Sequence, residues 1–133
     1  MPDSQNQLTS LLSDLKKRKL PATVKRTIQA MLDKKAERIT VLKLAGLCDI
    51  SDYLILCSGQ SSRQNQAICD EITCQLAQEM KNKPFSVEGT QSGEWILIDY
   101  IDFIAHIFLP EVRERYALEK MWMDAKRYDF FLD

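Results

Sequence analysis

The sequence lacks the features that identify several common functional classes. Its 133 residues contain no apolar run near the ~18 residues that a membrane span requires. The first ten residues lack the apolar core of a signal peptide. There is one histidine, and the four cysteines form no C-x-x-C pair, which argues against a zinc site. These absences predict a cytoplasmic protein with free thiols, no membrane association and no bound metal.

An excess of cations is also missing, since the formal net charge is −1. Nucleic-acid-binding domains usually carry a clear surplus of lysine and arginine, so the overall balance argues against one. The charge is nevertheless uneven, at +5 over residues 1–38 and −6 over residues 39–133. A basic run of Lys16, Lys17, Arg18 and Lys19 follows a leucine-rich helical pattern. Such runs usually form a solvated helix end, and contact with ribosomal RNA is the alternative.

Signatures of catalysis are absent as well. His106 lies in an expected strand with no local Cys–His pattern around it. Residues 58–63, Ser-Gly-Gln-Ser-Ser-Arg, precede a helix and could hold a phosphate, but they contain no Walker lysine and no G-x-G-x-x-G. Two Asp-x-x-Asp pairs fall in turns, where they do not provide two carboxylates on one strand face. The pairs are Asp49 with Asp52 and Asp99 with Asp102. We predict no catalytic, cofactor-binding or metal-binding residues.

The hydrophobic periodicity predicts an α/β fold, with a mixed five-stranded sheet, helices packed against it and an N-terminal helical extension. A 3.6-residue period marks the helices, and β-rich or alternating runs mark the strands. The expected helices are a basic one within residues 1–20, then 21–35, 61–82 and 110–116, and the expected strands are 39–44, 53–58, 85–88, 94–100 and 103–108. Ser61 and Gln64 have the spacing of a helix capping box. The segment after residue 116 is expected to be irregular.

The strongest compositional anomaly is a stretch without any lysine or arginine. Residues 84–112 contain five carboxylates and no cation. Strand alternation places Trp95, Leu97 and Asp99 on one sheet face and Ile96, Ile98 and Tyr100 on the other. An exposed tryptophan beside a carboxylate is typical of a protein-binding surface for a basic partner. The alternative is that another helix covers this face and buries Trp95, and the periodicity favours neither.

Several blocks, taken together and in order, resemble the Iojap or ribosomal silencing factor (RsfS) family over about residues 22–125. The blocks are Asp33-Lys34-Lys35-Ala36-Glu37, Ile50-Ser51-Asp52-Tyr53, Ser58-Gly59-Gln60-Ser61-Ser62-Arg63-Gln64, Val87-Glu88-Gly89, Gly93-Glu94-Trp95-Ile96-Leu97-Ile98-Asp99-Tyr100, His106-Ile107-Phe108, Pro110-Glu111-Val112-Arg113 and Leu118-Glu119-Lys120-Met121-Trp122. On this basis the expected organisation is a basic helical extension at 1–20, a silencing-factor domain at 21–125 and a tail at 126–133.

The resemblance implies a nucleotidyltransferase-like core without enzymatic activity. It implies binding to the large ribosomal subunit through ribosomal protein fourteen, on the face that meets the small subunit. The bound factor would block subunit joining and repress translation during starvation or stationary phase. The alternatives are a large-subunit assembly factor and a nucleotide-binding, nucleotidyltransferase-like enzyme with its ligand at residues 58–63.

The resemblance also suggests which residues bind the partner and how the free chain behaves. The expected partner-binding residues are Glu88, Trp95, Leu97, Asp99, Tyr100 and His106. Tyr100 alternates away from Asp99, so it joins this group only if the strand bends before the following turn. The free protein is expected to form a homodimer. Phe130, Phe131 and Leu132 in the tail are expected to dock on the domain or on a second copy.

Overall fold

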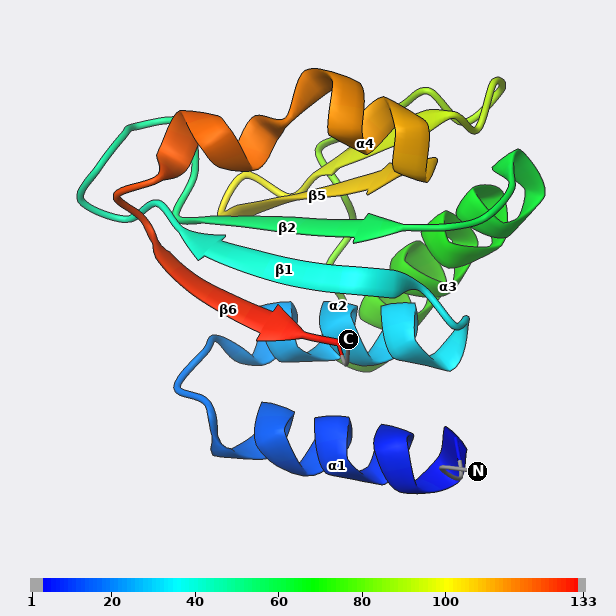
Figure 1. The fold of residues 1–133 in the computed structure, drawn as a ribbon, viewed down its shortest axis with the longest axis horizontal. Helices are drawn as coiled ribbons and strands as arrows, with labels where there is room; N and C mark the ends of the chain where they lie inside the picture. The colour runs from blue at the N-terminus through cyan, green and yellow to red at the C-terminus, as the bar shows by residue number, and fades with distance from the viewer. Residues whose placement is uncertain (1–3, 132–133) are drawn as a thin grey trace.

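The computed structural model describes residues 4–131, with side chains described from Leu8 onward, as one mixed sheet between layers of helices (Figure 1). The sheet has six strands in the order β3-β4-β5-β2-β1-β6. The elements are α1 (Ser4–Lys17), α2 (Ala22–Asp33), β1 (Glu37–Lys43), β2 (Tyr53–Ser58), α3 (Ser62–Met80), β3 (Ser86–Glu88), β4 (Trp95–Asp99), β5 (Phe103–Phe108), α4 (Pro110–Tyr116), the 3-10 helix η1 (Leu118–Trp122) and β6 (Lys126–Phe130). The mixed α/β fold is therefore confirmed.

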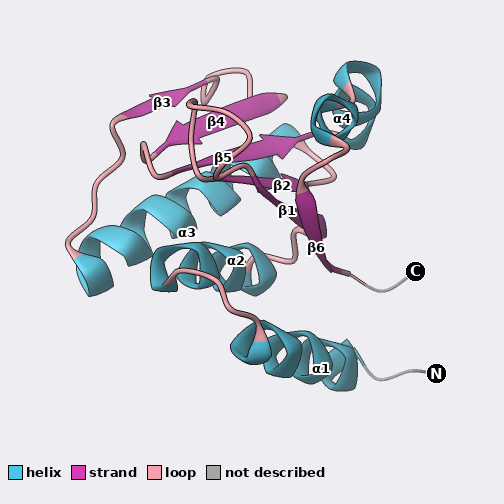
Figure 2. Cartoon of the chain, turned by 90° about the vertical axis from the view of Figure 1, so that its left-hand side faces the viewer, coloured by secondary structure: helices cyan, strands magenta, loops and turns pink. Residues whose placement is uncertain are grey.

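The two central strands, β2 and β5, are the parallel pair of this sheet. Leu56 lies opposite His106, and Ser58 lies opposite Phe108 at the ends of the two strands. Every other neighbouring pair is antiparallel. After β2 the chain turns into α3 on one face, whereas after β5 it turns into α4 on the other face (Figure 2). The carboxyl ends of β2 and β5 thus form the point at which the chain changes face.

The main core lies between the sheet and the helices α2 and α3, with α1 outside them (Figure 2). Ile68, Ile72 and Leu76 recur every four residues along α3 and are fully buried. Ile96 and Ile98 of β4 meet this layer and are also fully buried, as the alternation predicted. Burying each such side chain contributes about 1.5–3 kcal/mol, which fixes the register of the strand against the helices.

A second, smaller core lies on the opposite face. There α4 and η1 pack Val112, Leu118 and Trp122 against leucines of β1 and β2 and against Phe108 of β5. The expectation of an irregular segment after residue 116 is wrong. Residues 118–122 form η1, and residues 126–130 form the edge strand β6, which pairs with β1.

The strand β6 places part of the expected tail inside the sheet. Phe130 lies opposite Ile39 and is 1% exposed, so it docks on the body of its own chain. Tyr128 lies opposite Val41 and is buried as well. Strand alternation turns these two aromatic side chains toward the helices and places Arg127 and Asp129 on the other face of the sheet. Leu132 lies outside the described residues.

The local signals that predicted α3 are also confirmed. The Ser61 hydroxyl accepts a hydrogen bond from the Gln64 amide at 3.1 Å, which satisfies one orphan donor of the helix. The Gln64 side chain accepts from the Gln60 amide at 2.7 Å. Among the described residues, no helix is both long and apolar enough to cross a membrane.

Candidate functional site

The sheet register gathers most of the predicted partner-binding residues on the face opposite α2 and α3. Glu88 of β3 lies opposite Leu97 of β4, which lies opposite His106 of β5. These three residues therefore form one row across the sheet. Asp99 of β4 belongs to the adjacent row, and Trp95 forms the row at the other end of the strand. We call Glu88, Trp95, Leu97, Asp99 and His106 the acidic face.

The helix α4 covers only one end of the acidic face. Tyr116, at the end of α4, packs on Trp95 with ring centroids 4.8 Å apart, and Phe108 contacts the same indole at 5.2 Å. Trp95, Leu97 and Asp99 are all half-buried, and Glu88 is exposed. Both alternatives from the sequence apply in part, because a helix reaches Trp95 and leaves the acidic rows open.

Trp95 and His106 are joined by a hydrogen bond inside the acidic face. The indole Nε1 of Trp95 donates to Nδ1 of His106 at 2.9 Å. The acceptor must be a neutral imidazole with its proton on Nε2. His106 is 7% exposed, and burial lowers its pKa to about 4. His106 thus orients Trp95 and is uncharged at neutral pH.

This burial predicts a pH-dependent loss of stability. The unfolded chain takes up a proton at His106 near the ordinary pKa of 6.5, whereas the folded protein does so only near pH 4. The stabilisation is therefore complete above pH 6.5 and is lost as the pH falls toward 4. From pH 7 to pH 5 the free energy of unfolding should drop by about 2 kcal/mol from this group.

The measurement is urea unfolding at both pH values, compared with His106→Gln, which offers an acceptor to Trp95 but does not titrate. The variant should lose most of the difference between pH 7 and pH 5. Equal pH slopes for the two proteins would contradict the assignment.

Asp99 has a structural task as well as a place on the acidic face. Its Oδ1 accepts a hydrogen bond from the Ile101 amide at 2.7 Å. Ile101 has a φ of 73°, which is costly for a β-branched residue. The hydroxyl of Ser51 donates to the Ile101 carbonyl at 2.8 Å and supports the same turn from the other side. A substitution at Asp99 therefore disturbs the β4–β5 turn in addition to any partner contact.

Tyr100 does not belong to the acidic face. It is 6% exposed and belongs to the main core, where it stacks on Phe103 at 4.7 Å. Burial, and secondarily Cys69, raises the pKa of its hydroxyl to about 12. The expectation that Tyr100 joins the partner-binding residues is thus corrected, because the alternation of β4 continues through it without the required bend.

The loop at residues 58–63 uses its polar groups within the chain. Ser61 and Gln64 cap α3, and the Gln60 side chain donates to Glu37 at 2.8 Å. Within the described part of the chain, no group of three or more His, Cys, Asp or Glu side chains is arranged to hold a metal ion.

The basic run lies at the end of α1, on the side of the sheet that α2 and α3 cover (Figure 2). Arg18 pairs with Asp14 at 3.2 Å and lies over the ring of Tyr128 at 5.7 Å. Lys16 and Lys17 complete the last turn of α1 and are exposed. Because α1 and α2 lie beyond the opposite face of the sheet, these cations are separate from the acidic face.

Sequence reasoning missed a buried cation, Arg113. Its Nε donates to Glu119 at 2.7 Å, one terminal nitrogen donates to the Arg38 carbonyl at 2.6 Å and to the Ser58 hydroxyl at 3.2 Å, and the other donates to the Thr40 hydroxyl at 3.2 Å. The residue is 8% exposed and is one of the residues that line a cavity between α4, η1 and the sheet. Arg113 sits among Glu111, Glu114 and Arg115, a pattern that gives no sign of burial.

Comparison with known proteins relates this chain to ribosome-associated proteins. The family described as "Ribosomal silencing factor during starvation" matches residues 17–131. A ribosomal silencing factor from Halalkalibacterium halodurans is 39% identical over 98 residues, covering 74% of this chain and 83% of that protein. A mouse protein named for mitochondrial assembly of the ribosomal large subunit is 27% identical over 97 residues, covering 71% of this chain and 42% of that one.

A solved structure agrees with the fold. A crystal structure of a protein from Chromobacterium violaceum superposes with a TM-score of 0.75 at 29% identity, covering 87% of this chain and 95% of that one. The family match spans both cores of the sheet and includes β6. The chain therefore belongs to the ribosomal silencing factor family, which includes Iojap proteins.

Proposed function

We propose that this protein binds the large ribosomal subunit through ribosomal protein fourteen and sterically blocks its association with the small subunit. The family membership supports a role in silencing ribosomes, and the acidic face supplies a contact surface. The observation that carries the proposal is the accessible part of the acidic face, where exposed Glu88 lies opposite half-buried Leu97 and buried His106 supports Trp95 through a hydrogen bond. Repression of translation during starvation or stationary phase follows from the blocked association.

Charge supports this choice of surface. The segment that builds the acidic face carries five carboxylates and no lysine or arginine over residues 84–112. Ribosomal proteins are basic where they approach RNA, so the complementary charge would speed encounter and set the orientation of the complex. Leu97 and the accessible part of Trp95 add apolar area at the centre of the contact.

The test is sedimentation of the protein with purified large or small subunits. Glu88→Lys is the best variant, because Glu88 is exposed and lies on the acidic face. We expect selective binding to the large subunit and at least about tenfold weaker binding by Glu88→Lys at low salt. Asp70→Lys makes the same charge change on the exposed side of α3 and should bind like the wild type.

Two outcomes would contradict the proposal. Failure of the wild type to bind the large subunit would remove the function. Equal binding by Glu88→Lys and Asp70→Lys would remove the acidic face as the contact. Substitutions at Trp95 and Asp99 are less informative, since the first unpacks Tyr116 and the second releases the β4–β5 turn.

A role in large-subunit assembly is the second candidate, because the mouse relative is named for that process. The same surface would serve both roles. A deletion strain that accumulates large-subunit precursors would favour assembly, whereas normal subunits with excess joined ribosomes in stationary phase would favour silencing. We further propose that the free protein pairs as a homodimer, through the acidic face, so that dimer and ribosome compete for it.

A further inference from the structure

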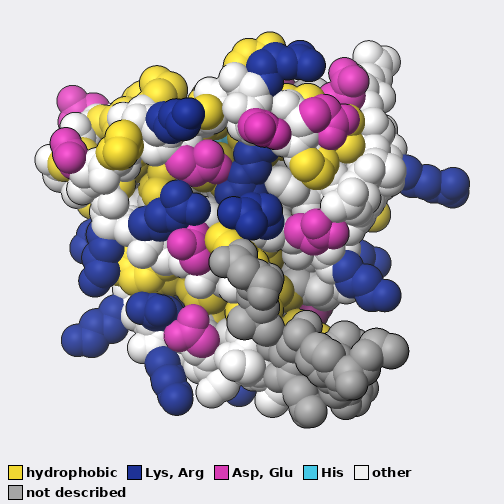
Figure 3. Space-filling view, viewed as in Figure 1, with side chains coloured by type: hydrophobic (Ala, Val, Ile, Leu, Met, Phe, Trp, Pro, Cys, Tyr) yellow, Lys and Arg dark blue, Asp and Glu magenta, His cyan; other side chains and the backbone are white. Residues whose placement is uncertain are grey.

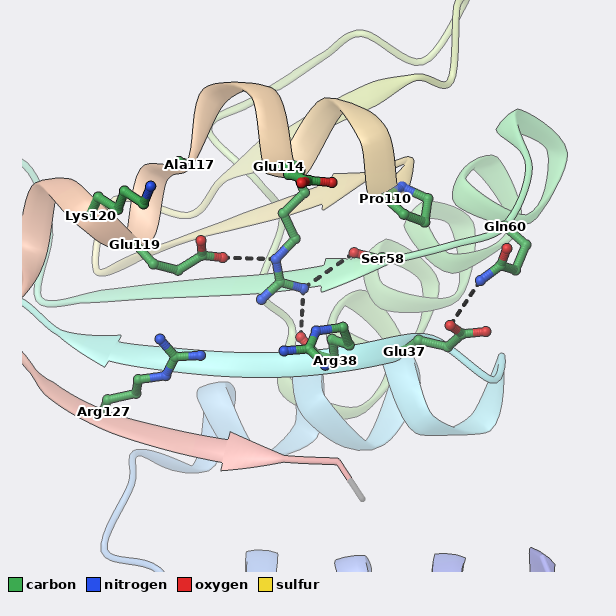
Figure 4. Close-up of a pocket in the computed structure, with 11 residues that line it drawn as sticks. Glu37, Arg38, Ser58, Gln60, Pro110, Glu114, Ala117, Glu119, Lys120 and Arg127 are labelled. Carbon is green, nitrogen blue, oxygen red and sulfur yellow. Dashed lines mark hydrogen bonds and ion pairs between the residues drawn. The ribbon is translucent and has the colours of Figure 1, made fainter. Parts of the chain in front are cut away.

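A cavity of about 600 Å³ lies where the chain changes face. Ser58, which ends β2, and Pro110, which begins α4 after β5, both line it (Figure 4). In open α/β sheets, small molecules bind in the crevice outside the carboxyl ends of parallel strands at this topological switch point. The volume falls within the 300–1,000 Å³ that is typical of small-molecule sites.

Cations from four different elements line this cavity. They are Arg38 of β1, Arg113 of α4, Lys120 of η1 and Arg127 of β6. Side chains of Lys and Arg gather near the middle of this side of the molecule, with carboxylates around them (Figure 3). Cations from four separate segments meet here and outnumber the carboxylates of the same lining, Glu37, Glu114 and Glu119, by one, so the cavity has a slight positive excess that favours an anion.

The carboxylates that also line the cavity are partly engaged. Glu119 accepts a hydrogen bond from Arg113 at 2.7 Å, and Glu37 accepts one from the side-chain amide of Gln60 at 2.8 Å. Arg127 pairs with Asp129 at 2.9 Å, and Asp129 also accepts a hydrogen bond from the Thr40 hydroxyl at 2.8 Å; both side chains of the ion pair are about 40% exposed, so water screens the pair and Arg127 is accessible to a further anion. Glu114 is exposed.

Arg113 gives the cavity a guanidinium in a fixed position, whose charge is balanced by Glu119. Its guanidinium is held by Glu119, by the Arg38 carbonyl and by the hydroxyls of Ser58 and Thr40. Because these contacts fix the side chain before any ligand arrives, little entropy is lost on binding. Ser58 and Gln60 add a hydroxyl and an amide within the same lining. Guanidinium, ammonium, hydroxyl and amide groups together suit phosphate oxygens.

We propose that this cavity binds a phosphate-bearing small molecule of nucleotide size, with its phosphates toward Arg113, Lys120 and Arg127. The cationic lining is confined to this one cavity, which favours a small ligand over an RNA backbone, because RNA needs a long accessible cationic track. The proposal concerns binding alone and involves no transfer step. The site is separate from the acidic face and does not depend on the proposed function.

The test is calorimetric titration of the full chain with pyrophosphate, tripolyphosphate, ATP and GTP, with sulfate at matched ionic strength. The cavity variant is Lys120→Gln with Arg127→Gln, since both side chains line the cavity and neither is buried. The matched control is Lys16→Gln with Lys17→Gln on α1, which removes the same charge elsewhere. Arg113 is left intact because it supports the fold.

We expect saturable binding of at least one phosphate compound, weakened tenfold or more in the cavity variant and unchanged in the control. The cavity variant should bind the large subunit like the wild type, which separates this site from the ribosomal contact. Absence of binding, equal weakening in both variants, or equal binding of sulfate would overturn the proposal. So would a short single-stranded RNA that competes for the site with an affinity that rises with its length.

Discussion

Arg113→Met is expected to lower the free energy of unfolding by about 3–5 kcal/mol. The guanidinium makes four hydrogen bonds, and the side chain of its partner Glu119 is only 20% exposed. Methionine fills much of the volume but leaves the Glu119 carboxylate without its cation and the Arg38 carbonyl without a donor. Leaving a largely buried carboxylate unpaired costs more free energy than the intact ion pair contributes to stability.

The helix α4 offers a matched control for this variant. Arg115→Met makes the same chemical change two residues away, at an exposed position, and should change stability by less than about 0.5 kcal/mol. Urea unfolding followed by circular dichroism measures both variants. Similar small losses for the two would show that the Arg113 contacts contribute little. A loss of stability in Arg113→Met but not in Arg115→Met would show that the Arg113 contacts stabilise the packing of α4 and η1 on β1 and β2.

Gly89→Ala is expected to destabilise the protein by about 3 kcal/mol or more. Gly89 has a φ of 84°, and a Cβ there would overlap the backbone carbonyl oxygen of Trp95. A backbone atom cannot rotate away, so β3 and β4 must separate or the turn must refold. The change also perturbs the acidic face, because Glu88 directly precedes Gly89 and lies opposite Leu97.

Gly46→Ala is the control that separates the two contributions at Gly89, the steric overlap with the Trp95 carbonyl and the cost of a positive φ. Gly46 has a nearly identical φ of 85°, but no atom lies within 4 Å of a Cβ placed there. It should therefore cost only about 1 kcal/mol, the penalty of a left-handed conformation for a residue other than glycine. Denaturant unfolding of both variants gives the difference, about 2 kcal/mol or more. Equal losses would indicate that the Gly89 turn relaxes without resisting the methyl group.

Much of the fold could be predicted because local signals and burial agree. Ile68, Ile72 and Leu76 recur at helical spacing and are all fully buried, and Ser61 caps their helix. In β4 the alternation correctly separated the buried Ile96 and Ile98 from Trp95, Leu97 and Asp99 on the other face. These signals act within a few residues, so sequence alone carries them.

The strand β6 could not be predicted because its partner is remote. Lys126, Arg127 and Asp129 make the segment look polar, and its pairing with β1 joins residues 126–130 to the distant residues 39–43. An edge strand needs only one buried face, which Tyr128 and Phe130 provide. Two apolar residues in a charged segment are too weak a pattern to distinguish this strand from a disordered tail.

The candidate sites differ in the same way. Alternation grouped Trp95, Leu97 and Asp99 on one sheet face, the family resemblance added Glu88 and His106, and Tyr100 lies in the main core instead. The hydrogen bond from Trp95 to His106 joins the neighbouring strands β4 and β5, and the four cations of the cavity come from four elements. Nothing in the spacing of these residues along the chain indicates that they meet. Tertiary structure alone brings them together.

The strand order has a consequence for how the chain reaches its native state. The β1–β2 and β4–β5 hairpins each close a short loop, which costs little entropy and allows rapid formation. Joining β2 to β5 and β1 to β6 closes much longer loops, and such non-local pairing slows folding. We expect the hairpins to form early and the β1–β6 pairing late. Arg127 therefore reaches Arg113 and Lys120 last, so an incompletely folded chain has its hairpins before it has the cavity.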